Sequence, residues 1–266
     1  MKTVTWGSTP IHTSADEVAG RFVGDGEREW YEIAAYDGMD PFLVTLASAG
    51  DHWFFISSRG GLTCGRKSPD HALFPYYTDD KVHDAAATTG PFTAFLVDGG
   101  ADTALWRPFL DVIPSVYEIS RRIAKDVTGT AIRFAEYNAT LQLGFAYTWE
   151  LSDRFGFVRS CRLENRGESR SITVIDGLRN ILPAGADRVG QERVSTLLDG
   201  YKQCELDGST GLALYTLGSI LTDRAEPSEA LRATTVYKRG LPDAVILLSE
   251  QRVPEILQGA PAERDS

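Results

Sequence analysis

Short runs of β-branched and aromatic residues, with few helix signals between them, constrain the fold of this chain more than any other feature of its sequence. Such residues fit the pleated, half-buried surface of a sheet, so each run is a candidate strand. The candidates are Phe42–Leu46, Trp53–Ser57, Phe92–Val97, Ala131–Tyr137, Leu141–Leu151, Phe157–Leu163, Ser171–Ile175, Leu212–Leu217 and Ala244–Leu248. We therefore predict an all-β protein built from antiparallel sheets.

One pair of runs predicts a hairpin. Polar and apolar side chains alternate in Arg159–Leu163, and Glu164–Glu168 supplies turn residues before Ser171–Ile175 resumes the pattern. In this register the apolar positions would be held by Val158, Cys161 or Leu163.

Helix signals are weak. Glu226–Arg232 can begin a short helix, because proline lies in its first turn and acidic residues lie near its N-terminus. Ser115–Lys125 fits either a helix or a strand.

A chain of 266 residues can form one large sandwich, which we place at residues 1–257. Gln258–Ser266 has the composition of a linker and predicts that the chain is a piece of a longer protein.

The charge balance argues against a nucleic-acid partner. Asp and Glu number 37 against 27 Lys and Arg, for a formal net charge of −10, whereas phosphate binding needs a basic face.

The three cysteines, Cys64, Cys161 and Cys204, have no pair at metal-ligand or redox spacing and are expected to be reduced thiols. The N-terminus lacks the apolar core of a secretory signal, and no apolar run approaches the roughly 18 residues that span a bilayer. We expect no membrane partner and a cytoplasmic location.

Common catalytic signatures are absent from the sequence. It contains no GxGxxG, GxxxxGK[ST], HExxH or GxSxG, so nucleotide-binding, zinc-protease and α/β-hydrolase functions have no local support. One group of histidines and aspartates has no recognised metal spacing, and it consists of Asp70, His71, Asp79, Asp80, His83 and Asp84. We expect neither a cofactor nor a metal, and we interpret this group as a solvated loop.

Ser57–Asp84 is the candidate binding segment, because it gathers basic, acidic and aromatic side chains just after a predicted buried strand. Sugars present apolar C–H faces and a rim of hydroxyls, which aromatic faces beside planar hydrogen-bonding groups can bind. The candidate sugar-binding or interface residues here are Arg59, Arg66, Lys67, Asp70, His71, Tyr76, Tyr77, Asp79, Asp80 and Lys81. The competing interpretation is a solvated charged loop in which Phe74, Tyr76 or Tyr77 closes the end of a sandwich.

Three further candidates lie outside this segment. Tryptophan on a strand is usually buried, so Trp106, in a predicted loop, is expected to be more accessible than Trp53 or Trp149. Arg179 and Asn180 follow a predicted core strand, where polar groups either serve a site or interface or simply meet solvent.

Three segments together resemble the N-terminal β-supersandwich region of cellobiose-phosphorylase-like proteins, which are relatives of glycoside phosphorylases and hydrolases. The segments are Ser57–Asp84, Tyr147–Glu164 and Ile175–Leu182. In such proteins the sandwich, similar in fold to galactose mutarotase, precedes a helical linker and an (α/α)6 barrel that contains the general-acid carboxylate. The resemblance implies a non-catalytic domain that packs against a C-terminal catalytic barrel, helps form a homodimer and lends a loop to the rim of a sugar site.

Three functional hypotheses follow. The first is a carbohydrate-associated supersandwich domain of a larger glycoside hydrolase or phosphorylase. The second is a self-contained aldose 1-epimerase, which needs a histidine acid and a carboxylate base facing one hexose. Its acid would be His71 or His83, and its base would be Glu136, Glu150 or Glu164. The third is a ligand-free interaction module whose Ser57–Asp84 segment is covered by another chain or domain.

Overall fold

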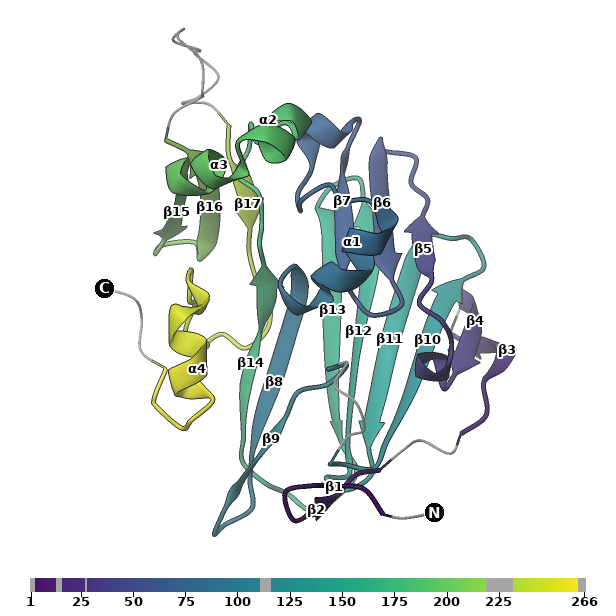
Figure 1. Ribbon diagram of the computed structural model, residues 1–266. Helices are drawn as coiled ribbons and strands as arrows, with labels where there is room; N and C mark the ends of the chain where they lie inside the picture. The colour runs from purple at the N-terminus through teal and green to yellow at the C-terminus, as the bar shows by residue number, and fades with distance from the viewer. Residues whose placement is uncertain (1–2, 13–15, 27, 111–115, 219–231, 263–266) are drawn as a thin grey trace, which may run out of the picture.

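The fold is described by a computed structural model that covers residues 3–12, 16–26, 28–110, 116–218 and 232–262 (Figure 1). Within these residues seventeen strands pair antiparallel, and the helices between them are short. The prediction of an all-β, antiparallel sandwich with few short helices is confirmed.

The larger layer is a six-stranded sheet with the order β13-β12-β11-β10-β4-β3. Its strands are β3 (Ala19–Asp25), β4 (Arg28–Ala34), β10 (Ile119–Asp126), β11 (Ala131–Asn138), β12 (Leu143–Ser152) and β13 (Gly156–Asn165). Successive side chains on a strand point to opposite faces, so Ile132, Phe134 and Glu136 on β11 share one face. We call this face, which holds the core, the inner face.

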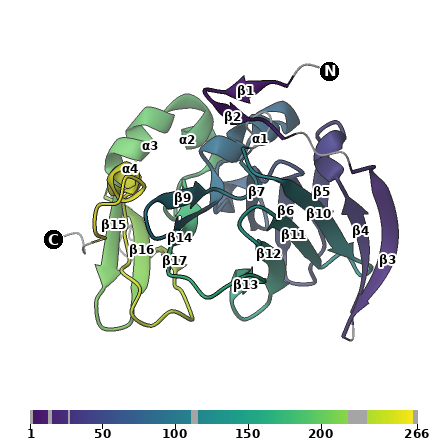
Figure 2. The same ribbon diagram turned by 90° about the horizontal axis from the view of Figure 1, so that it is seen from below.

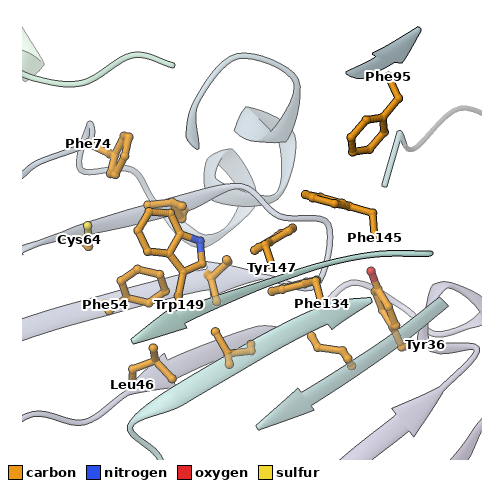
Figure 3. Packing of buried hydrophobic residues seen from close by; sticks show 14 of the residues in the cluster. Tyr36, Leu46, Phe54, Cys64, Phe74, Phe95, Phe134, Phe145, Tyr147 and Trp149 are labelled. Carbon is orange, nitrogen blue, oxygen red and sulfur yellow. The ribbon is translucent and has the colours of Figure 1, made fainter. Parts of the chain in front are cut away.

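Two three-stranded sheets form the second layer and pack on the inner face (Figure 2). One consists of β5 (Leu43–Leu46), β6 (His52–Ser57) and β7 (Leu62–Arg66), and the other of β8 (Gly90–Asp98), β9 (Thr103–Trp106) and β14 (Ile172–Arg179). Aromatic rings join the layers: Phe54 and Trp149 have centroids 5.5 Å apart, and Phe95 and Phe145 have centroids 5.2 Å apart (Figure 3). The main hydrophobic core therefore lies between the two layers.

The remaining elements lie around this sandwich. A third sheet contains β15 (Lys202–Asp207), β16 (Leu212–Leu217) and β17 (Thr234–Val236), and its neighbours are the helices α2 (Arg188–Arg193), α3 (Ser195–Tyr201) and α4 (Val253–Ile256). Both views place these elements on the side of the molecule opposite β3 and β4 (Figures 1 and 2). The other elements are a hairpin of β1 (Thr5–Trp6) and β2 (Thr9–Pro10), the helix α1 (Asp79–Asp84), and the 3-10 helices η1 (Tyr36–Gly38), η2 (Pro69–His71), η3 (Ala85–Ala87) and η5 (Glu250–Arg252).

The predicted hairpin of Arg159–Leu163 with Ser171–Ile175 is wrong. β13 pairs with β12 along its whole length, and β14 pairs with β8 in the other layer. The turn residues between them are present, but they carry the chain from one layer to the other. Of the residues expected at apolar positions, Cys161 and Leu163 are exposed, because β13 is the outermost strand of its sheet.

Other predictions of local structure need correction as well. Ala244–Leu248 is not a strand, and its residue Ile246 lies beside Gly211. The ambiguous run Ser115–Lys125 is largely strand β10, which begins at Ile119. Most of the predicted helix Glu226–Arg232 lies outside the described residues, as do the end of the Gln258–Ser266 tail and Ser115.

Several strands escaped prediction because their sequences lack a clear apolar run. They are β3, β4, β7 and β15, which are rich in charged residues, glycine or small polar residues, and β9, which has only four residues. Among the described residues, no helix has the length and apolar character needed to cross a bilayer.

Candidate functional site

A small cavity beside the six-stranded sheet is the candidate binding site, and its volume is about 60 Å³. Its lining consists of Tyr36, Asp37, Met39, Pro41, Ser58, Arg59, Phe109, Arg121, Phe134 and Tyr147. We call it the Arg121 cavity. It combines aromatic rings with a carboxylate, two guanidinium groups and several hydroxyls, which are groups that can bind a polyhydroxylated ligand.

Strand register builds the floor of the Arg121 cavity. Phe134 on β11 lies opposite Tyr147 on β12, and Arg121 on β10 lies opposite Glu136 on β11, all on the inner face. The rings of Phe134 and Tyr147 stack with their centroids 5.0 Å apart (Figure 3). The alternation of side chains along the strands therefore places a guanidinium beside two stacked rings.

A buried carboxylate holds the arginine in place. The Glu136 side chain is only 1% exposed, and it accepts hydrogen bonds from Trp106 Nε1 at 2.8 Å, the Phe109 backbone N–H at 2.7 Å and Arg121 Nε at 2.8 Å. Hydrogen bonds to an ionised group are stronger than neutral ones, and a buried charge needs such partners. Glu136 thereby fixes both Arg121 and the Phe109 loop in the cavity wall.

The rest of the Arg121 guanidinium lies between a carbonyl and a second carboxylate. Its Nη2 donates to the Leu110 carbonyl at 3.0 Å, and its Nη1 lies 3.7 Å from Asp37 Oδ2, which is longer than a hydrogen bond. Burial acts to lower the pKa of Arg121, but Glu136, Tyr36 and Asp37 together raise that pKa above its ordinary value. The cavity therefore contains a permanent cation whose Nη1 can share a ligand hydroxyl with Asp37.

Two tyrosines complete the polar lining. Tyr36 and Tyr147 flank Phe134, with ring centroids 6.1 and 5.0 Å from that of Phe134 (Figure 3). Burial raises the pKa of Tyr36 well above its ordinary value and also raises the pKa of Tyr147. Both hydroxyls therefore stay neutral, and each can donate and accept a hydrogen bond.

Of the residues predicted in the Ser57–Asp84 segment, Arg59 is the one that lines the cavity. Arg66 and Lys67 are exposed, and Arg66 donates to the Gly50 carbonyl at 3.3 Å. Asp70 accepts from the Arg188 backbone N–H at 3.1 Å, at the start of α2. Much of the segment thus contacts its own chain, away from the cavity.

The aromatic and acidic part of the segment is divided between core and surface. Phe74 is fully buried, which confirms that one of the three aromatic residues belongs to the core. Tyr76 is 43% exposed and packs edge-on against Trp53, while Tyr77 is half-buried. The other polar candidates, His71, Asp79, Asp80 and Lys81, are exposed on η2 and α1.

The candidates outside the segment have structural partners. Trp106 was expected to be more accessible than Trp53 or Trp149 but is only 1% exposed, because β9 turns its ring into the core, where it donates to Glu136. Arg179 donates to the Ala87 and Ala86 carbonyls at 2.6 and 3.2 Å, and Asn180 Nδ2 donates to Thr89 Oγ1 at 3.0 Å. These two residues serve a contact within the chain.

The residues of the epimerase hypothesis are dispersed. Within the described part of the chain, no histidine lines the Arg121 cavity. His83 instead bonds Ser57, and Glu150 and Glu164 form ion pairs with Arg28 and Arg166. The described residues also contain no group of three or more His, Cys, Asp or Glu side chains placed to hold a metal ion.

Most cavity residues were missed by sequence reasoning, although one signal was present. On β11 the inner-face positions are Ile132, Phe134, Glu136 and Asn138, so two polar residues continue an apolar row. A polar residue at a core position needs a buried partner, and here the partner of Glu136 is Arg121.

Comparisons with known proteins identify no relative, since no protein-family model and no curated protein matches the chain.

Proposed function

We propose that this sandwich is a carbohydrate-associated domain and that the Arg121 cavity is its sugar contact. The observation that carries the proposal is the fixed guanidinium of Arg121, anchored by Glu136 beside the stacked rings of Phe134 and Tyr147. Sugars combine apolar C–H faces with hydroxyls that both donate and accept, and this lining offers partners for both. A rigid polar group also loses little entropy on binding.

The size of the cavity defines how much of a sugar it can take. A volume of about 60 Å³ is well below the roughly 300–1,000 Å³ of pockets that enclose a whole small ligand. One hydroxymethyl group or one edge of a ring would enter, and the rest of the sugar would lie against the exposed lining residues Met39, Pro41 and Arg59. The cavity thus suits the end of a glycan better than an enclosed hexose.

A domain of this kind would work beside a catalytic domain. The resemblance to the N-terminal supersandwich of glycoside phosphorylase-like and hydrolase-like proteins supports a helical barrel as its neighbour and a homodimer as its assembly. In that setting the sandwich would hold one end of the carbohydrate while the catalytic carboxylates belong to the barrel.

Isothermal titration with a panel of mono- and disaccharides tests the proposal. We expect saturable binding by at least one sugar, and a 2- to 10-fold loss of affinity in Tyr147→Phe, because a hydrogen bond contributes about 0.5–1.5 kcal/mol. Tyr76→Ala is the matched control, because Tyr76 is an exposed aromatic residue outside the cavity lining. Binding that is lost in Tyr76→Ala but kept in Tyr147→Phe would refute the assignment of the site.

A further inference from the structure

We propose that His83 on α1 is a positioning residue for sugar recognition, and that it acts through the turn Ser57–Gly61. This inference rests on the proposed function of the Arg121 cavity. The imidazole itself does not line the cavity, whereas Ser58 and Arg59, in the middle of the turn, do.

A buried hydroxyl connects His83 to the turn. Ser57 is 0% exposed, and its Oγ lies 2.6 Å from His83 Nδ1. The same Oγ accepts a hydrogen bond from the Arg59 backbone N–H at 3.1 Å. The hydroxyl thus links the ring of His83 directly to the backbone of a cavity residue.

Glycines fit the turn tightly between α1 and the cavity floor. A Cβ atom on Gly61 would lie 2.1 Å from the Val82 carbonyl oxygen of α1, and a Cβ atom on Gly60 would lie 3.4 Å from the Tyr147 hydroxyl. Gly60 also has a φ of 91°, which favours glycine. The turn therefore lies in close contact with α1 and within van der Waals reach of Tyr147.

Backbone hydrogen bonds make the turn a rigid unit. Gly60 N–H donates to the Ser57 carbonyl at 2.8 Å, and Ser57 N–H donates to the Gly61 carbonyl at 2.7 Å. Ser58 exchanges two bonds with Phe42, through its backbone N–H at 2.8 Å and through its Oγ at 3.2 Å. Because the turn is stiff, a change at its Ser57 end is transmitted to Arg59.

A double-mutant cycle tests this role, with sugar affinity measured by titration in His83→Ala, Arg59→Ala and the double variant. We expect a 2- to 10-fold loss of affinity in His83→Ala, the range that one hydrogen bond supplies, and less than a further 2-fold loss when the change is added to Arg59→Ala. His83→Asn, whose amide can occupy the place of Nδ1, should restore affinity to within 2-fold. Lys81→Ala, an exposed change on the same helix, should leave affinity unchanged.

The outcomes separate this inference from the proposed function. If the wild type binds no sugar in the panel, the proposed function fails and this inference fails with it. If the wild type binds but His83→Ala has unchanged affinity, the positioning role is overturned while the cavity assignment stands; if His83→Ala loses as much affinity in the Arg59→Ala background, the positioning of Arg59 by His83 is overturned. The amide NMR signal of Arg59 gives a test that needs no ligand: it should shift in His83→Ala and return in His83→Asn, and an unchanged signal would contradict the link.

Discussion

Replacement of Glu136 by glutamine should destabilise the protein far more than the same change at another paired glutamate. Three donors converge on the Glu136 carboxylate, from Trp106, Phe109 and Arg121. The Arg121 side chain is 11% exposed, and its next carboxylate, on Asp37, lies 3.7 Å away. Glutamine removes the charge and turns an amide N–H₂ toward one of the three donors.

The magnitude follows from burial. Removing one partner of a buried ion pair costs about 3–5 kcal/mol, because it leaves the other charge without compensation. The matched control is Glu150→Gln, since Glu150 pairs with Arg28 while their side chains are 32% and 50% exposed. An exposed pair of this kind contributes about 0–1 kcal/mol. We therefore expect the two variants to differ by at least about 2 kcal/mol.

Urea denaturation at pH 7, followed by circular dichroism, measures both free energies of unfolding. The double variant Arg121→Met, Glu136→Gln should lose less stability than the sum of the single changes, because it removes the isolated charge. If Glu136→Gln is within 1 kcal/mol of the wild type, or no worse than Glu150→Gln, then the buried pair does not anchor the cavity wall.

Three other predictions concern the sheet and the thiols. Burial acts to raise the pKa of Asp126, but hydrogen bonds from Thr128, Ala131 and Thr130 lower it overall. The unfolded chain therefore binds the proton first as pH falls, so the stabilisation is present above about pH 4 and lost below it. Asp126→Asn should cost about 1–2 kcal/mol at pH 7 and progressively less below pH 4, and a loss that does not change with pH would contradict this. Although Cys161 as a residue is exposed, partial desolvation of its thiol and the Asp176 carboxylate raise the pKa of Cys161 to about 12, and burial raises the pKa of Cys64 and of Cys204. All three should react with a thiol reagent at pH 8 much more slowly in the folded than in the urea-unfolded protein; equal rates at Cys161 would refute the raised pKa. Gly65→Ala should cost about 1–3 kcal/mol in thermal or urea unfolding, because its Cβ would lie 2.4 Å from the His71 carbonyl oxygen. Gly24→Ala, which meets open space, should cost almost nothing, and equal effects would exclude a steric cause.

The sequence was most informative where a strand is buried on one face. Runs such as Ala131–Tyr137 and Leu141–Leu151 became β11 and β12, because period-two alternation and β-branched or aromatic residues leave few alternatives. The pairing of strands was not predictable in the same way. The hairpin expected after Arg159–Leu163 failed because local turn residues do not specify which layer receives the next strand.

The candidate site was hard to predict because it depends on contacts between distant segments. Arg121 meets Glu136 only through the register of β10 and β11, and Trp106 reaches the same carboxylate from the other layer. The composition of the Ser57–Asp84 segment pointed to the correct neighbourhood through Arg59, but most of its polar side chains hold the segment itself in place or face solvent.

An NMR titration of the isotope-labelled protein with the sugar panel tests whether the Arg121 cavity binds carbohydrate. We expect one or more sugars to shift the amide signals of Tyr36, Ser58, Arg59 and Arg121 along a single saturable curve. Shifts confined to Tyr76 and Tyr77, or no saturable shift with any sugar, would contradict the assignment of the Arg121 cavity as a carbohydrate site.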